Sequence, residues 1–128
     1  GLKAGTAYLF RIRAYVKTGN TTLSSSYLNT IAARTLPAAV TGFKLTARTS
    51  TSIKLGWDKN ASAGGYIVEQ YKNGKWVSVA KLSKATTSYR VTGLKAGATY
   101  KFRIKAYTTS GITKLYSGYQ TISVKTAN

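Results

Sequence analysis

The chain alternates apolar and polar side chains with a period of two over most of its length. The clearest runs are residues 53–57, 100–106 and 122–124, and helical periodicity is nearly absent. Such alternation is typical of β-strands with one buried face and one exposed face. Turn signals separate the runs, and Asn73-Gly74 is the strongest hairpin signal among them. We therefore expect an all-β protein.

The spacing of these runs predicts seven short strands in the second part of the chain. They are expected at residues 41–48, 52–58, 65–72, 75–82, 86–92, 99–108 and 118–126. Short antiparallel strands separated by turns at regular intervals favour a seven-stranded β-sandwich. We expect the rings of Tyr66, Tyr89 and Tyr100 to lie inside it.

One phrase occurs twice. Residues 1–15, GLKAGTAYLFRIRAY, recur as GLKAGATYKFRIKAY at residues 93–107, with eleven of fifteen positions identical. The only proline, Pro37, lies between the copies, and residues 37–128 number 92, which equals the offset of the repeat. We therefore expect residues 1–35 to be the last two strands of one repeat, residues 36–39 a linker, and residues 40–128 a complete repeat.

Four stretches resemble the fibronectin type III family: SIKLGW, GYIVEQY, TTSYRVTGL and LKAGATYKFRIKAY. The resemblance implies an immunoglobulin-like sandwich with Trp57 in its core. It also places Tyr100 at the tyrosine corner, where a ring hydroxyl bonds to nearby backbone, and gives Tyr8 the same role in the first copy. Two features depart from the family. Gln70 stands where an aromatic side chain is frequent, and the expected loop at residues 108–115, TTSGITKL, lacks the integrin-binding Arg-Gly-Asp.

Titratable groups suited to catalysis are scarce. Twenty Lys and Arg residues face only Asp58 and Glu69, giving a net charge of +18, and the chain has no Cys or His. Acid–base catalysis and metal binding need more carboxylate, imidazole or thiol groups than this. We expect no enzyme activity, no cofactor and no metal. Asp58 and Glu69 are expected on the surface, where Glu69 can pair with a base on the neighbouring strand.

The charge points instead to polyanionic partners, such as an anionic cell-wall polymer or polysaccharide. The alternation directs several basic side chains to one outer face of the sandwich. The candidate polyanion-binding residues are Lys101, Arg103, Lys105 and Lys125. The alternative is that lysines on exposed sheet faces discourage aggregation.

Aromatic residues exceed what a core of this size needs, with ten tyrosines and two tryptophans. Exposed rings can stack on sugars. The candidate carbohydrate-stacking residues are Tyr71, Trp76 and Tyr107, and Tyr116 and Tyr119 are also expected outside the core. The alternative is that these rings form cross-strand pairs that stabilise a sheet.

The resemblance to the fibronectin type III family, together with the abundance of Lys, Thr, Ser and Tyr, implies a non-catalytic spacer or adhesion module of a larger bacterial protein, extracellular and either secreted or attached to the cell surface. Its partners would be the neighbouring domains of the same protein. A second hypothesis is a binding module that takes an anionic polymer or carbohydrate on its basic sheet face. A third hypothesis is a structural fibre subunit, in which strands from other copies of the chain complete the partial repeat at residues 1–35. The alternative is that further sequence of the same protein completes that repeat. No apolar run approaches the about 18 residues needed for a membrane span.

Overall fold

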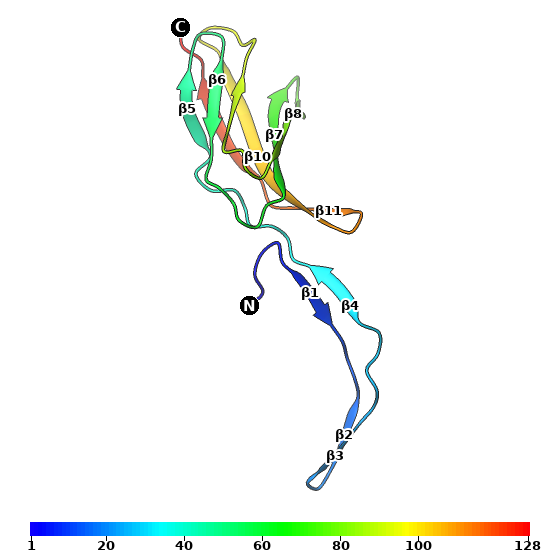
Figure 1. Cartoon of the computed structure of the whole chain (residues 1–128). Coiled ribbons are helices and arrows are strands. Elements are labelled where there is room, and N and C mark those ends of the chain that lie inside the picture. Colours follow the sequence, from blue (N-terminus) through cyan, green and yellow to red (C-terminus); the bar gives the residue numbers. More distant parts are fainter.

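The computed structural model describes residues 1–128 and contains strands but no helix (Figure 1). The first part of the chain holds four short strands: β1 Ala7–Phe10, β2 Tyr15–Thr18, β3 Thr21–Ser24 and β4 Ile31–Arg34. The second part holds eight: β5 Lys44–Arg48, β6 Ile53–Gly56, β7 Gly65–Lys72, β8 Lys75–Ser83, β9 Ser88–Val91, β10 Thr99–Ser110, β11 Thr113–Tyr116 and β12 Gln120–Lys125. No helix that could cross a membrane is present.

Residues 40–128 form the predicted antiparallel sandwich. One sheet has the order β5-β6-β9, and the other has the order β11-β10-β7-β8 with β12 also paired to β10. All seven expected strands are present, so the alternation gave the right fold class.

One expected loop is wrong. Residues 108–115 belong to a hairpin, because β10 continues to Ser110 and pairs with β11 through Tyr107↔Tyr116 and Thr109↔Lys114. Gly111 makes this hairpin possible, since it adopts a positive φ of 61° at the turn. Figure 1 shows the β10–β11 hairpin projecting sideways from the sandwich.

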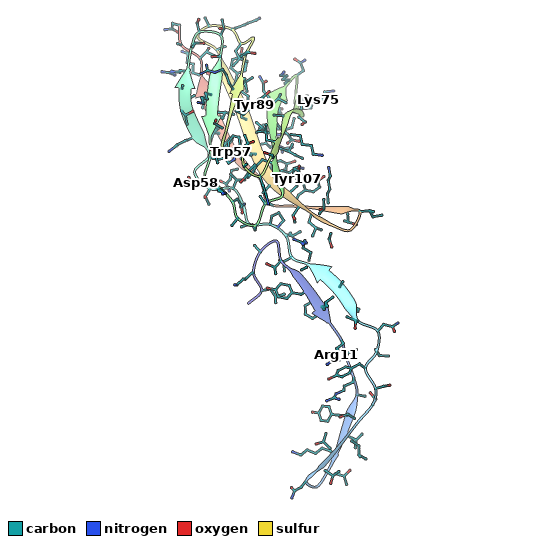
Figure 2. All side chains as sticks on the ribbon, viewed as in Figure 1. Arg11, Trp57, Asp58, Lys75, Tyr89 and Tyr107 are labelled. Atoms are coloured by element: carbon teal, nitrogen blue, oxygen red, sulfur yellow. The ribbon has the colours of Figure 1, made fainter.

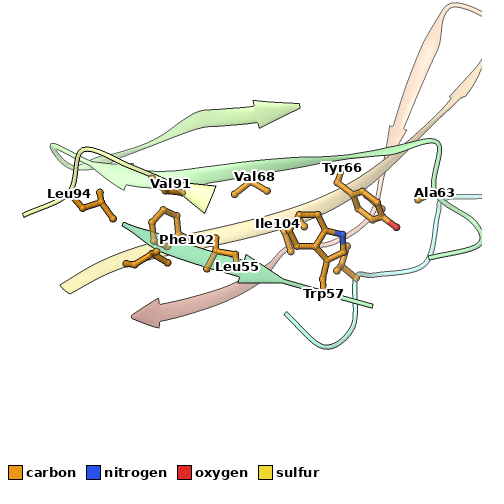
Figure 3. Close-up of a cluster of buried hydrophobic side chains, with 12 residues drawn as sticks. Leu55, Trp57, Ala63, Tyr66, Val68, Val91, Leu94, Phe102 and Ile104 are labelled. Carbon is orange, nitrogen blue, oxygen red and sulfur yellow. The ribbon is translucent and has the colours of Figure 1, made fainter. Parts of the chain in front are cut away.

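The core lies between the two sheets (Figure 3). Trp57 is 5% exposed, and its ring meets the fully buried ring of Tyr66 edge to face at 5.5 Å between centroids. Phe102 and Ile104 of β10 are fully buried. Gln70 is also buried, and no hydrogen-bond partner reaches its Oε1. Twelve buried apolar residues form the cluster: Val40, Ile53, Leu55, Trp57, Ala63, Tyr66, Val68, Val91, Leu94, Phe102, Ile104 and Ala106.

Residues 1–35 form a long hairpin with the strand register of the second copy. Tyr8↔Ala33 in β1–β4 corresponds to Tyr100↔Val124 in β10–β12. The first of the two expected strands is divided into β1 and β2, and the second contains β4. β3 is a further strand at the positions equivalent to β11. β1 pairs with β4 near the sandwich, and β2 pairs with β3 at the far tip (Figure 1).

The apolar face of this first hairpin is exposed. Phe10 is 47% exposed and Ile12 is 64% exposed, whereas the equivalent Phe102 and Ile104 are fully buried. In the second copy, the sheet β5-β6-β9 covers these positions, and residues 1–35 contain no such sheet.

Candidate functional site

The outer face of the sheet containing β7, β8 and β10 carries most of the predicted site residues. Lys101, Arg103 and Lys105 alternate along β10 with buried residues and therefore point away from the core. Lys125 of β12 lies opposite Thr99 at one end of the same face. The structure thus places the four candidate polyanion-binding residues on one surface.

A bulge in β8 brings Trp76 to this surface. The register between β7 and β8 shifts between Val68 and Glu69, so that Trp76 lies directly opposite Tyr71. A bulge inserts one extra residue and reverses which side chains face outward beyond it. The two rings meet edge to face with centroids 5.2 Å apart.

Arg103 is the centre of the face. Its Nε donates to Oε2 of Glu69, which lies directly opposite on β7. Its guanidinium carbon lies 4.4 Å from the ring centroid of Trp76 and 3.7 Å from that of Tyr119. The expected pairing of Glu69 with a base of the neighbouring strand is therefore present, and Arg103 is already neutralised within the chain.

The lysines beside Arg103 also lie over rings. The Lys105 ammonium is 4.1 Å from the ring centroid of Tyr116 and 4.9 Å from that of Tyr119. The Lys101 ammonium is 6.0 Å from the ring centroid of Tyr71. Such cation–ring contacts are attractive, so the basic and aromatic candidates form one mixed surface. We call it the basic aromatic face, made of Tyr71, Trp76, Lys81, Lys101, Arg103, Lys105, Tyr107, Lys114, Tyr116 and Tyr119.

The first hairpin repeats the central contact. The guanidinium carbon of Arg11 lies 3.7 Å from the ring centroid of Tyr27, and that of Arg13 lies 4.7 Å away. These residues are 92 positions before Arg103, Lys105 and Tyr119. Cation–ring packing on this face is thus a property of both copies.

A second group on the face surrounds Tyr107, near the end of the sandwich that lies closest to the first hairpin (Figure 2). The ammonium groups of Lys81 and Lys114 each lie 5.3 Å from its ring centroid. A hydrogen bond from Lys81 and the repulsion of its positive charge lower the pKa of Lys114. Sequence reasoning missed Lys114 because it expected a loop there; the alternation in Thr113–Tyr116 was the available signal.

The rings of the face differ in accessibility. Tyr71, Tyr116 and Tyr119 are 43%, 38% and 37% exposed, while Trp76 and Tyr107 are half-buried. Of the rings expected inside, Tyr66 is fully buried, and Tyr89 and Tyr100 are half-buried against the core. No ring of the basic aromatic face belongs to the core cluster.

The carboxylates form no catalytic arrangement. Glu69 is bound to Arg103, and Asp58 is exposed and accepts a hydrogen bond of 3.0 Å from the Thr41 hydroxyl. No group of three or more metal-ligating side chains occurs in the structure.

A second feature of interest is the joint between the first hairpin and the sandwich. The side chains of Asn60 and Ser62 hold the linker: Asn60 Nδ2 donates to the Ala38 carbonyl at 2.7 Å, and the Ala38 amide donates to Ser62 Oγ at 2.9 Å. Pro37 of the linker is buried. Gly5 has a positive φ of 61°, and a Cβ there would lie only 2.4 Å from the Ser62 carbonyl oxygen. Only glycine permits this approach.

The same hydrogen bond from a backbone amide to a tyrosine hydroxyl occurs in both copies. Tyr8 Oη accepts from the Lys3 amide at 2.8 Å, and Tyr100 Oη accepts from the Lys95 amide at 2.9 Å. The Gly5 amide donates to the Leu36 carbonyl, tying the start of the hairpin to the linker. The linker is therefore bonded on both sides.

Comparisons with known proteins agree with this architecture. Residues 38–121 match the fibronectin type III domain family. The solved structure of FN3tt superposes with a TM-score of 0.59 at 20% identity, covering 71% of this chain and 95% of that chain. The human fibronectin type III domain containing protein 3 contributes a domain with a TM-score of 0.57 at 21% identity, covering 71% of this chain and 86% of that chain. These likenesses concern the fold.

Several curated relatives are bacterial enzymes. Chitinase A1 of Niallia circulans is 32% identical over 99% of this chain and 18% of its own length. Exoglucanase B of Cellulomonas fimi is 28% identical over 98% of this chain and 12% of its own length. Poly(3-hydroxybutyrate) depolymerase of Ralstonia pickettii is 42% identical over 54% of this chain and 13% of its own length. The chain thus spans less than a fifth of each relative, and it belongs to the fibronectin type III family.

Proposed function

We propose that the chain is a non-catalytic spacer module that holds the parts of a larger extracellular bacterial protein at a fixed separation. The bonded joint is the observation that carries this proposal. Most linkers between modules are flexible and contact little, whereas here the linker bonds to the loop carrying Asn60 and Ser62. A stiff joint keeps the two modules at a fixed separation and orientation, as a spacer requires.

The relatives support the setting of this role. By name they are a chitinase, an exoglucanase and a depolymerase, and enzymes that degrade polymers too large to enter a cell work outside it. The match is a small part of each, which fits an accessory module. Its neighbours would be other domains of the same protein.

Hydrogen exchange tests the joint. The Ala38 amide should exchange slowly in the wild-type chain because it donates to Ser62 Oγ. Changing Asn60→Ala and Ser62→Ala together should release that protection, while the control Ser123→Ala on the exposed face of β12 should leave it unchanged. Exchange of Ala38 at the rate of an unstructured peptide in the wild-type chain would remove the basis of the proposal.

A second candidate function is contact with an anionic polymer or carbohydrate through the basic aromatic face. The clustering of Lys101, Arg103 and Lys105 with four aromatic rings favours it. Changing Lys101, Arg103 and Lys105 to Ser should weaken binding to heparin more than changing Lys44, Lys59 and Lys84 to Ser. Both triple variants lose three positive charges, so an equal weakening of heparin binding in the two would mean that net charge alone accounts for the binding. Binding should also weaken with added salt, because a bound polyanion releases counterions.

A further inference from the structure

Lys81, Tyr107 and Lys114 form a compact group that we call the Tyr107 clamp. The two ammonium groups lie at the same distance, 5.3 Å, from the centroid of one ring. They come from different strands: Lys81 is on β8 and Lys114 is on β11, the strands at the two ends of the order β11-β10-β7-β8. The β10–β11 hairpin is what brings Lys114 to this position.

The ring of Tyr107 has a fixed support. It lies over Gly65, the residue directly opposite on β7. A Cβ at Gly65 would be 2.5 Å from Tyr107 Oη and 2.6 Å from its Cζ, so the glycine leaves the space that the ring fills. An aromatic ring packed over a glycine of the adjacent strand is a stabilising arrangement in sheets. The backbone at Gly65 therefore supports the ring of Tyr107.

No carboxylate of the chain is available to the clamp. Glu69 is bound to Arg103 and Asp58 to Thr41, and these are the only acidic residues. A hydrogen bond from Lys81, and after it the repulsion between the two positive charges, lower the pKa of Lys114. An oxyanion between them would relieve that repulsion.

The clamp is confined to the second copy. Ninety-two positions earlier, Tyr15 corresponds to Tyr107, but Thr22 corresponds to Lys114. The paired ammonium groups are thus absent from the first hairpin, although the Arg11–Tyr27 stacking is present there. The clamp is a feature separate from the general cation–ring packing of the face.

We propose that the Tyr107 clamp binds the carboxylate of a uronic acid residue in an acidic polysaccharide. The inference deepens the second candidate function and rests on it. Cations lie over the rings of Tyr107, Tyr116, Tyr119 and Trp76, so these rings are less open to stacking by a nucleic-acid base, and the two ammonium groups of the clamp favour an oxyanion. Two hydroxyl side chains on the same face of the sheet as the clamp, Ser83 and Thr109, suit the hydroxyl groups of a sugar chain.

Titration calorimetry of the full 1–128 chain with polygalacturonate tests the site. The double variant Lys81→Gln/Lys114→Gln should bind about tenfold more weakly than wild type, a loss of about 1.4 kcal/mol. The control Lys44→Gln/Lys84→Gln has the same net charge and exposed positions, and should bind within about twofold of wild type. Equal weakening in both double variants, or no binding of polygalacturonate by the wild type, would overturn the proposal.

A spectroscopic measurement reports on the clamp itself. Saturating polygalacturonate should raise the pKa of Lys114, measured by NMR of its side chain, because a bound carboxylate offsets the Lys81 charge. An unchanged pKa would contradict the assignment. Uncharged dextran should not shift it, and oligothymidylate binding the clamp as tightly as polygalacturonate would reject a polysaccharide in favour of nucleic acid.

The outcomes separate the proposals. If changing Lys101, Arg103 and Lys105 abolishes binding while the clamp variant binds as wild type does, the second candidate function stands and the clamp does not. If neither variant affects binding, both fail. The spacer proposal depends on the joint and is tested by the Ala38 amide.

Discussion

Replacing Trp57 by alanine tests the core of the sandwich. The side chain is 5% exposed and packs against the rings of Tyr66 and Phe43, with centroid distances of 5.5 and 6.4 Å. Its Nε1 is buried without an acceptor, so the substitution removes no hydrogen bond. The cost therefore comes from lost apolar burial and from the cavity left behind.

The magnitude follows from the buried area. A tryptophan side chain buries about 150–250 Å², and at about 25 cal/mol per Å² this burial is worth about 4–6 kcal/mol as an upper bound. Measured truncations of large aromatic residues cost about 3–5 kcal/mol. Domains of this size have free energies of unfolding of about 5–10 kcal/mol, so Trp57→Ala should remove a large part of the stability.

Urea unfolding of the 1–128 chain, followed by circular dichroism, measures this loss. Thermal unfolding should shift by at least about 12 °C, since each kcal/mol corresponds to about 4–8 °C in a small domain. Trp57→Phe is the matched control, because it keeps an aromatic ring and removes the unpaired Nε1; it should cost no more than about 2 kcal/mol. A Trp57→Ala chain that melts within about 3 °C of wild type would refute the core assignment.

Three further predictions follow from the hydrogen bonds and exposed surfaces. Tyr100→Phe should lower the free energy of unfolding of the sandwich by about 1 kcal/mol in urea titrations, because it removes the acceptor of the Lys95 amide. Tyr8→Phe removes the equivalent acceptor in the first hairpin and should leave the unfolding midpoint of the sandwich unchanged. Equal effects of the two substitutions would contradict the assignment of Tyr100 alone to the sandwich. Gly5→Val should abolish the slow exchange of the Ala38 amide, since its Cβ would collide with the Ser62 carbonyl; retained protection would show that the contact is not formed. The exposed apolar face of the first hairpin should make 1–128 associate as concentration rises in analytical ultracentrifugation, whereas 37–128 should stay monomeric; a monomeric 1–128 would argue against completion of the hairpin by other copies of the chain.

The alternation of side chains was sufficient to predict the sandwich, because a strand with one buried and one exposed face carries apolar residues at every second position. It also placed Lys101, Arg103 and Lys105 on one surface. Trp76 was expected outside the core, but the alternation did not show the bulge between β7 and β8 on which its outward direction depends. A bulge shifts the period by one residue, and the local sequence shows no turn signal at that point.

The joint and the clamp lay beyond sequence reasoning for another reason. The contact of Gly5 with Ser62 joins residues 57 positions apart, and the pairing of Lys81 with Lys114 joins residues 33 positions apart. Neither pair shares a local pattern. Both contacts depend on how loops and a hairpin meet once the sheets have formed. The hairpin was not predicted because the small residues at 108–111 are typical of a loop.

The stiffness of the joint is the central claim, and a distance between two spin labels tests it most directly. The chain has no cysteine, so Ala32→Cys on the first hairpin and Ala96→Cys at the far end of the sandwich would carry the only labels, and both positions are exposed. Double electron–electron resonance should give one narrow distance distribution, and Asn60→Ala/Ser62→Ala should broaden it. A distribution in the unmodified joint as broad as in that variant would contradict a stiff spacer.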